Sequence, residues 1–314
     1  MPDAHALLST VGFPVARDPV PLQGGKDNLT WRVAVPGHAD AIVQLMRSPK
    51  SARDLAFLRA ALAALAAHPA LGVAPAHPAF PGDRFTPIDA GVVQVMQALP
   101  GRSLRPDTLT PDLLVRASGH LRLLHTATAS FPSADWRDAN PHRGRLPTLM
   151  ADAAASVARL GDPDARATLD ALRRRFEANR FDPATVPHGL IHGDPAFKNF
   201  LTDGHAITGL IDYDMLSVHA RLWDLADLLR STLKLDWVDD ALWAAMLDGW
   251  PLIDAERAAL PDAVRAMTLD TGARYLLALD PTSGHYASDA LAAAQRCVRD
   301  HDRVATLLGG PPAA

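Results

Sequence analysis

Asp194 and Asn199 stand five positions apart in the polar stretch 192–199, which follows an apolar segment. Asp194 precedes Pro195, and a residue before proline is disfavoured in the α-helical region, so the stretch is predicted to be an extended loop. Polar side chains on a loop after a buried strand are typical of functional sites. A carboxylate there can accept a proton from a hydroxyl group, and an amide oxygen can bind a hard metal ion.

A second pair of acidic residues, Asp212 and Asp214, begins thirteen positions after Asn199 and ends an apolar run. Side chains two positions apart share one face of a strand, so both are expected to point the same way if the strand continues. Two carboxylates shielded from water are costly unless a cation binds them. Mg²⁺ takes few protein ligands when phosphates supply the others, and it would meet this need.

The same loop could instead hold a different metal ion. His188, His192 and Asp194 alternate along an extended segment and could form a zinc site with open positions. The glycines at 189 and 193 leave the geometry undetermined. A zinc-dependent hydrolase is therefore an alternative function.

The first third of the chain has the patterns of a β-rich unit. Strands are predicted at 20–22, 29–35, 41–46 and 91–98, the first at a sheet edge because it contains Pro21. Leucines at intervals of three and four predict a helix over 51–67. The proline-rich stretch 68–90 is predicted to connect these elements.

The rest of the chain is predicted to be mostly helical from Pro111 to Leu308. A β island over 190–213 interrupts the helices, and its Asp203-Gly204 pair predicts a hairpin turn. We therefore expect an α+β chain with a β-rich lobe at 1–98, a hinge at 99–104 and a helical lobe at 105–314.

These motifs together resemble the aminoglycoside phosphotransferase and choline kinase family. His192-Gly193-Asp194 with Asn199 fits the string H-G-D-x-x-x-x-N, and Ile211-Asp212-Tyr213-Asp214 fits I-D-[FYW]-[DE]. The segments 24–33, 96–104, 121–125 and 223–226 resemble the family's first hairpin, hinge, pre-loop helix and D-L-A motif. The resemblance spans residues 10–235 and implies a bilobal protein-kinase-like fold.

The resemblance also implies a role for each site residue. Asp194 would be the catalytic carboxylate that accepts the proton of the acceptor hydroxyl. Asn199 and Asp212 would hold Mg²⁺ at the phosphates of ATP, with GTP left open. Possible additional site residues are Asp214 and Lys198, and Asp224 would brace the catalytic loop. Nucleotide contacts would come from Gly24, Gly25, Asn28, Gln44, Gln97 and Leu99.

One position departs from the family pattern. Kinase-like folds place a basic residue on the third strand and pair it with a glutamate on the next helix. Here those positions are Gln44 and Asp54. Glutamine carries no charge, so it would attract phosphates weakly unless Arg47 or Lys26 replaces the missing cation. A nucleotide-binding module with little turnover is therefore a second alternative.

Composition limits the partners of the chain. The net charge of −4 and the sequence pI of about 6.3 argue against a nucleic-acid binder. The sequence has no stretch of about 18 apolar residues, so no membrane span is expected. The lone Cys297 permits no internal disulfide and is expected to be a buried structural thiol, so a cytoplasmic protein is expected.

The expected partner is therefore a small molecule with a hydroxyl group: an amino alcohol, amino acid, sugar or aminoglycoside-like compound. Its contacts would come from the C-terminal helices. A cationic acceptor would need an acidic cleft, for which the candidates are Asp236, Asp239, Asp240 and Asp248. The sequence does not predict an oligomeric state.

Overall fold

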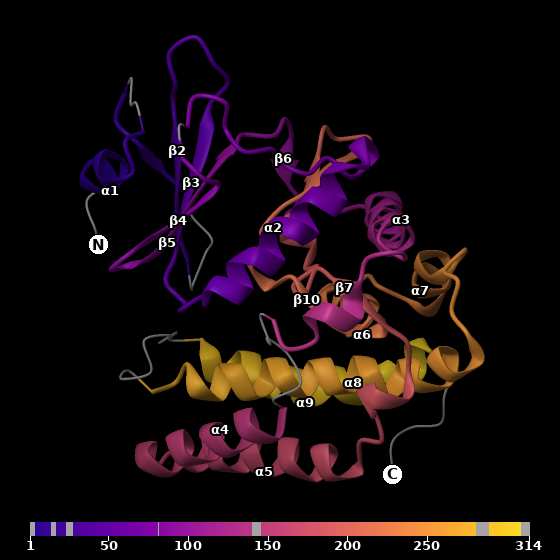
Figure 1. The fold of residues 1–314 in the computed structure, drawn as a ribbon. Helices are drawn as coiled ribbons and strands as arrows, with labels where there is room; N and C mark the ends of the chain where they lie inside the picture. The colour runs from indigo at the N-terminus through magenta and orange to yellow at the C-terminus, as the bar shows by residue number, and fades with distance from the viewer. Residues whose placement is uncertain are drawn as a thin grey trace. The chain divides into compact units, whose positions relative to one another are not determined.

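The computed structural model describes residues 4–13, 17–22, 28–80, 82–139, 146–280 and 289–308, which form two compact units (Figure 1). One unit comprises Met1–Arg102 with Leu201–Asp214, and the other comprises Ser103–Phe200 with Met215–Ala314. The segment 201–214 therefore belongs to the first unit, although the sequence analysis grouped it with the helical lobe. The predicted lobe and hinge boundaries stay a prediction.

An antiparallel sheet of five strands forms the first unit, in the order β1-β2-β3-β5-β4. Its strands are β1 (Val20–Pro21), β2 (Asn28–Val33), β3 (Ala41–Met46), β4 (Phe85–Ile88) and β5 (Gly91–Gln97). Val33, Val43 and Val95 are fully buried, and they share an apolar cluster with Leu7 and Leu8 of α1 (Ala4–Thr10). The β-rich unit and the edge position of Val20 are confirmed.

Strand β4 corrects the expectation that 68–90 only connects other elements. Phe85 at its start is buried, and the strand pairs with β5 alone. Pro87 is compatible with such an edge strand because one side of the strand needs no ladder hydrogen bonds. The stretch also contains a short 3-10 turn, η1 (Pro69–Leu71).

Helix α2 (Ala52–Ala66) follows the sheet's third strand, as the leucine spacing predicts. Ser51 caps its first turn, since its hydroxyl accepts the Asp54 N–H at 3.1 Å. Asp54 returns the contact by accepting the Ser51 N–H at 2.8 Å, which completes a capping box. The leucines of the predicted stripe form the buried face of this helix.

A hairpin of β8 (Phe200–Thr202) and β9 (Ile207–Leu210) carries the chain to Asp212. The Asp203 carboxylate accepts the N–H groups of His205 and Ala206, each at 2.8 Å, and Gly204 has a φ of 104°. The predicted Asp-Gly turn is therefore confirmed.

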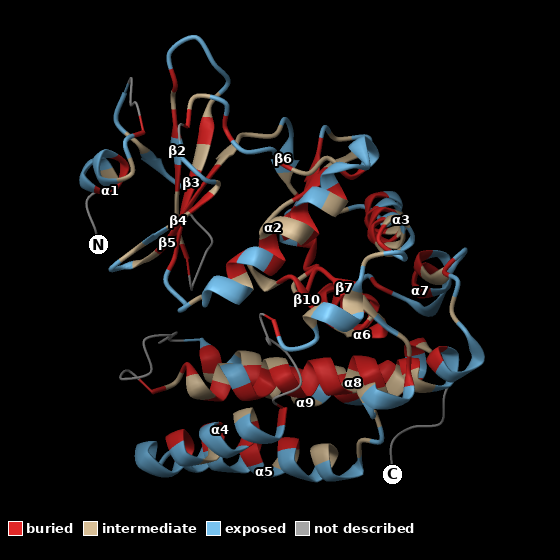
Figure 2. Cartoon of the chain, in the orientation of Figure 1, coloured by how far each residue is buried: buried red, intermediate tan, exposed pale blue. Residues whose placement is uncertain are grey.

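The second unit is mostly helical. Its helices are α3 (Pro111–Ala127), α4 (Leu146–Leu160), α5 (Pro163–Ala178), α6 (Leu222–Thr232), α7 (Asp240–Leu247), α8 (Asp254–Leu277) and α9 (Ala290–Leu307). Helix α8 contacts α4, α5, α6 and α9 and is buried along most of its length (Figure 2). No helix in the described part of the chain is long and apolar enough to cross a membrane.

Short extended segments complete the molecule: β6 (Arg102–Ser103), β7 (His188–Ile191) and β10 (Ser217–Ala220). Strands β7 and β10 pair antiparallel, with Ile191 opposite Ser217. Strand β10 was not predicted, because it lies outside the β island read from the sequence. The α+β fold class is confirmed.

Candidate active site

The loop after β7 brings three predicted site residues together in the second unit. Asn199, at the end of the 3-10 turn η4 (Phe197–Asn199), donates from Nδ2 to the Asp194 carbonyl at 2.7 Å and to its Oδ2 at 3.2 Å. Lys198 Nζ lies 3.6 Å from the same carboxylate oxygen. The Asp194 side chain is 23% exposed, so it is held by its neighbours and still reachable by a ligand.

Asp224 of α6 braces this loop, as predicted. Its carboxylate is fully buried and accepts the N–H groups of His192 at 2.7 Å and Gly193 at 2.9 Å. His125 Nε2 of α3 lies 3.0 Å from the same group. Burial alone would raise the pKa of Asp224, but the hydrogen bond and charge of His125, with His192 and Gly193, hold it below its usual value. A buried anion thus fixes the backbone on the N-terminal side of Asp194.

Gly193 is required at the turn into the loop. Its φ is 85°, and a Cβ atom there would lie 2.2 Å from the Met215 carbonyl oxygen. Both the left-handed backbone and the close approach favour glycine over any other residue.

The first unit holds Asp212 and Asp214, and the strand does not continue to them, which was the condition for a shared direction. Strand β9 ends at Leu210, and a 3-10 turn, η5 (Tyr213–Met215), follows Asp212. Asp212 has a φ of 69°, the one positive value among the described non-glycine residues. Such a conformation costs free energy and is typical of functional positions. The strand alternation therefore ends before Asp212, and the two carboxylates have different partners.

Asp212 is the end of a chain of hydrogen bonds that begins at a half-buried cation, Arg84. Gln44 Nε2 donates to Asp212 Oδ1 at 3.1 Å. With the Gln94 amide oriented to satisfy its neighbours, its nitrogen donates to Gln44 Oε1 at 3.1 Å, and its oxygen accepts from Arg84 Nε at 2.9 Å. Burial lowers the pKa of Arg84 to about 10, so the guanidinium stays charged at neutral pH. Sequence reasoning missed Arg84, because it lies in the stretch read as a connection.

Asp214 contacts the first strands and a second cation that sequence reasoning missed. Asn28 Nδ2 donates to Asp214 Oδ2 at 2.7 Å, and Lys50 Nζ donates to the Asp214 carbonyl at 3.1 Å. Burial lowers the pKa of Lys50, against the attraction of Asp214 and Asp54. A signal was available, because Lys50 directly precedes the N-cap of α2, the helix on which the family pattern places an acid.

Asp54 fills a capping role in the structure, through its two contacts with Ser51. Arg47 is exposed. Gly24, Gly25 and Lys26 lie outside the described residues, so the predicted first turn over the nucleotide stays a prediction.

The predicted nucleotide-binding residues Gln97 and Leu99 lie at the end of β5. The N–H of Gln97 donates to Pro75 O at 2.9 Å, and that of Ala98 to Asp40 O at 2.8 Å. The N–H of Leu99 makes no hydrogen bond within the described residues. A free backbone donor next to a strand end suits a flat heteroaromatic ring such as a nucleobase.

The predicted magnesium ligands have suitable chemistry. Asn199 uses its amide nitrogen on Asp194, which leaves its Oδ1 as an acceptor for a cation. Oxygen atoms of amides and carboxylates are the ligands that Mg²⁺ prefers. For the zinc alternative, no three His, Cys, Asp or Glu side chains of the described residues are grouped to hold a metal. His192 is fully buried, and its Nδ1 accepts the Asp194 N–H at 3.3 Å.

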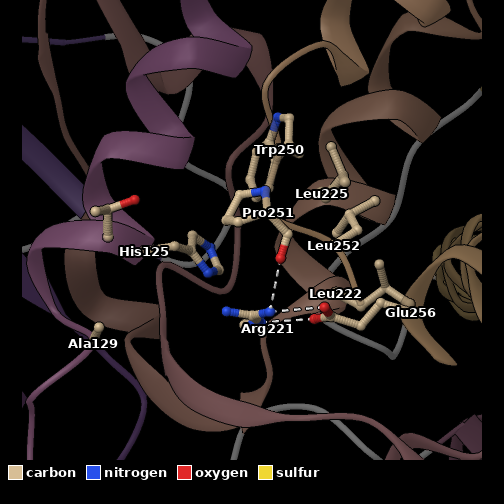
Figure 3. A pocket seen from close by; sticks show the side chains of 10 residues that line it. His125, Ala129, Arg221, Leu222, Leu225, Trp250, Pro251, Leu252 and Glu256 are labelled. Carbon is tan, nitrogen blue, oxygen red and sulfur yellow. Dashed lines mark hydrogen bonds and ion pairs between the residues drawn. The ribbon is translucent and has the colours of Figure 1, made fainter. Parts of the chain in front are cut away.

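One cavity of the second unit is lined mainly by apolar groups of α3, α6 and the turn before α8 (Figure 3). Its charged groups are already engaged. Arg221 donates to both carboxylate oxygens of Glu256 at 2.7 Å and to Pro251 O at 3.2 Å. His125 is the residue that contacts Asp224. The polar side chains of this cavity therefore stabilise the surrounding structure, including Asp224. They leave few free hydrogen-bonding groups for a polar acceptor.

The acidic candidates for a cationic cleft do not line either cavity found in the second unit. Asp239, for example, caps α7 by accepting the Leu242 N–H at 2.9 Å. Cys297 is buried, and burial raises the pKa of its thiol to about 12, so it is a structural thiol as predicted.

A five-stranded sheet unit, a helical unit and a braced H-G-D loop define a phosphotransferase of the kinase-like class. The chain belongs to the phosphotransferase enzyme family, whose family model matches residues 18–266. The predicted resemblance is confirmed.

Among curated proteins, the homoserine kinase of Methylobacillus flagellatus is 32% identical over 181 residues, which are 56% of this chain and 54% of that protein. The chain thus spans about half the length of the curated relatives it matches.

Two solved structures share the fold over nearly the whole chain. Amicoumacin kinase hAmiN, in complex with AMP-PNP, Ca²⁺ and Ami, has a TM-score of 0.69 and 17% identity, and covers 100% of this chain and 96% of that one. A microcompartment-associated aminopropanol kinase has a TM-score of 0.66 and 20% identity, and covers 98% of each chain. The predicted kinase-like fold is therefore confirmed.

Proposed function

We propose that this protein transfers the γ-phosphoryl group of ATP to a hydroxyl group of a small molecule. The observation that carries the proposal is the Asp194 carboxylate, which is reachable and is held by Asn199 on a loop braced by buried Asp224. A base that is held in one orientation and remains open to ligand is what proton transfer from a hydroxyl requires.

In the proposed reaction, the acceptor oxygen forms a bond to the γ-phosphorus, the bond from that phosphorus to the bridging oxygen breaks, and ADP leaves. The hydroxyl proton passes to a carboxylate oxygen of Asp194. Asn199 keeps this carboxylate in place through its amide nitrogen, and Lys198 lowers the energy of negative charge beside it.

Asn199 and Asp212 are the proposed Mg²⁺ ligands, and the ion would neutralise charge on the nucleotide phosphates. Asp214 is a weaker candidate, since Asn28 already occupies one of its oxygens. In the first unit, Asn28, Gln44, Gln97 and Leu99 are the proposed nucleotide-binding residues, together with Gly24 and Gly25.

Homoserine is the first acceptor to test, because the curated relatives are homoserine kinases. Aminopropanol and amicoumacin follow from the printed names of the structural neighbours. GTP should be tried beside ATP.

The test measures ADP release with Mg-ATP across these acceptors for wild type and for Asp194→Asn. Loss of the base is expected to lower kcat about 10²- to 10⁴-fold, while nucleotide binding, measured on the same sample, stays unchanged. Asp203→Asn is the control, because Asp203 is an exposed acid in a turn that also suits asparagine.

Undiminished turnover by Asp194→Asn would refute the role of Asp194. Nucleotide binding without turnover for wild type, with any acceptor, would instead favour the binding module. That alternative is motivated by the neutral side chain of Gln44 beside Asp212.

A further inference from the structure

A second cavity of the second unit, of about 320 Å³, lies between the end of α6 and the helices α8 and α9. Its volume is at the lower end of the range for small-molecule sites. Five charged side chains line it: Arg230, Lys234, Asp289, Arg296 and Asp300. The cavity thus carries both signs of charge, unlike the mainly apolar cavity in Figure 3.

Most of these charged groups have binding capacity left. Arg230 is held by Asp227 at 2.7 Å. Lys234, Asp289, Arg296 and Asp300 make no hydrogen bond or ion pair with their side chains anywhere in the described ranges. Charged groups in a concave site that form no hydrogen bond or ion pair are suited to a ligand with matching charges.

The cavity adjoins the loop that carries Asp194. Lys234 Nζ lies 4.2 Å from the centre of the Phe197 ring, and Phe197 begins the turn that ends at Asn199. Asp194 is also one of the charges that act on Lys234 and Arg230. The cavity is therefore continuous, through Lys234 and Phe197, with the turn that follows the proposed base.

Both signs of charge are present at neutral pH. Burial lowers the pKa of Lys234 to about 8, so most of this amine is protonated at pH 7. Burial raises the pKa of Asp300 to about 6, so most of this carboxyl is ionised at the same pH.

From this arrangement we infer that the cavity binds the acceptor as a zwitterionic amino acid. Lys234 and Arg296 bind its carboxylate, and Asp300 with Asp289 binds its ammonium group. The inference rests on the proposed kinase function and narrows the acceptor from any hydroxyl compound to hydroxy amino acids. An amino alcohol or a polycationic antibiotic would bring positive charge beside the exposed side chains of Lys234 and Arg296 without pairing either of them, and like charges placed together disfavour binding.

Three acceptors that share one hydroxyl chain test the charge pattern. L-homoserine carries both charged groups, 3-aminopropan-1-ol lacks the carboxylate, and 4-hydroxybutyrate lacks the ammonium group. We expect kcat/KM for L-homoserine to exceed that for either analogue at least about 100-fold, because each analogue leaves charged groups of the site unpaired. Equal or higher kcat/KM for 3-aminopropan-1-ol would overturn the inference.

Variants then separate the two ends of the acceptor. Arg296→Gln and Lys234→Met are expected to raise KM for L-homoserine about 10-fold or more, the value of a charged hydrogen bond, and to leave 3-aminopropan-1-ol unaffected. Asp300→Asn should raise KM for L-homoserine and leave 4-hydroxybutyrate unaffected. Arg174→Gln is the matched control, an exposed arginine of α5 that does not line the cavity.

A purely structural role would change all three acceptors equally in every variant, and that result would refute the assignment. L-2-aminobutyrate, which is L-homoserine without the hydroxyl group, tests binding apart from chemistry by calorimetry. Its binding to wild type and not to Arg296→Gln would support the cavity even if no acceptor were phosphorylated, and would then refute only the kinase function. Turnover of 3-aminopropan-1-ol without binding of L-2-aminobutyrate would refute the cavity and leave the kinase function in place.

Discussion

Gln44 replaces the basic residue expected on the third strand, and its neighbours show how the protein compensates. The chain Arg84, Gln94, Gln44 and Asp212 runs from a cation to an anion, and each group donates to the next. Hydrogen bonds aligned in this way polarise one another, especially in a partly buried site. The positive charge therefore comes from Arg84 and not from the third strand. Gln94 and Gln44 connect this charge to the Asp212 carboxylate through hydrogen bonds.

Arg84→Gln tests this chain of hydrogen bonds. The change removes the charged donor from Gln94 and from Ala74 O, so we expect about 2 kcal/mol lower stability and weaker stabilisation by Mg-ATP. Arg59→Gln is the control, because Arg59 also lies over the Phe85 ring but is paired with Asp83 at the surface, and its loss should cost less than about 1 kcal/mol. Urea unfolding with and without Mg-ATP measures both. Equal effects of the two changes would contradict the role of Arg84.

Among the elements, the loop after β7 is held through its backbone as well as through its side chains. Asp224 on α6 accepts two consecutive loop N–H groups. Gly193 has a positive φ and lies against the carbonyl of Met215, the last residue of η5. The position of Asp194 therefore depends on Asp224 of another element and on the backbone conformation of Gly193.

Gly193→Ala is expected to strain this turn, with a cost of about 1–2 kcal/mol for the left-handed backbone and more for the contact with Met215 O. Gly189→Ala is the matched control on β7, because a Cβ there has no neighbour within 4 Å and φ is not positive. We expect a lower Tm and reduced turnover for the first and little change for the second. If Gly193→Ala keeps the wild-type Tm and kcat, the turn is not required.

For the molecule as a whole, buried Asp224 makes stability depend on pH. Its pKa is lowered in the folded state despite burial, because His125, His192 and Gly193 stabilise the anion. Its contribution is therefore fully present above the usual aspartate pKa of about 4 and is lost as pH falls through the lower folded value.

Asp224→Asn is expected to cost about 3–5 kcal/mol at pH 7, as for one lost partner of a buried pair. The difference from wild type should shrink below about pH 4, where wild type also loses the charge. Asp112→Asn is the control, since Asp112 forms an exposed pair with Arg116 and should matter little at either pH. A difference that stays constant from pH 7 to pH 3 would rule out this account.

Patterns among neighbouring residues were enough to predict the local features of this protein. Leucine spacing gave α2, Asp203-Gly204 gave the hairpin turn, and the H-G-D motif with Asn199 identified the loop, because each depends on residues close in the chain. The prediction that Asp224 braces that loop is of another kind, because its partners His192 and Gly193 lie 32 and 31 positions away and the prediction came from the resemblance to the family's D-L-A motif.

Only the tertiary structure decided the partners of these residues. Arg84 and Gln94 are separated from Gln44 by 40 or more positions, and the cavity charges Lys234 and Arg296 by 62, so no local pattern could join them. Pairing of β5 with both β3 and β4, and packing of α8 against both α6 and α9, brings them together. A shared direction for Asp212 and Asp214 was expected only if the strand continued, and the structure ends the strand at Leu210. The hydrogen bond from Gln44 to Asp212 joins residues 168 positions apart, which no local pattern predicts.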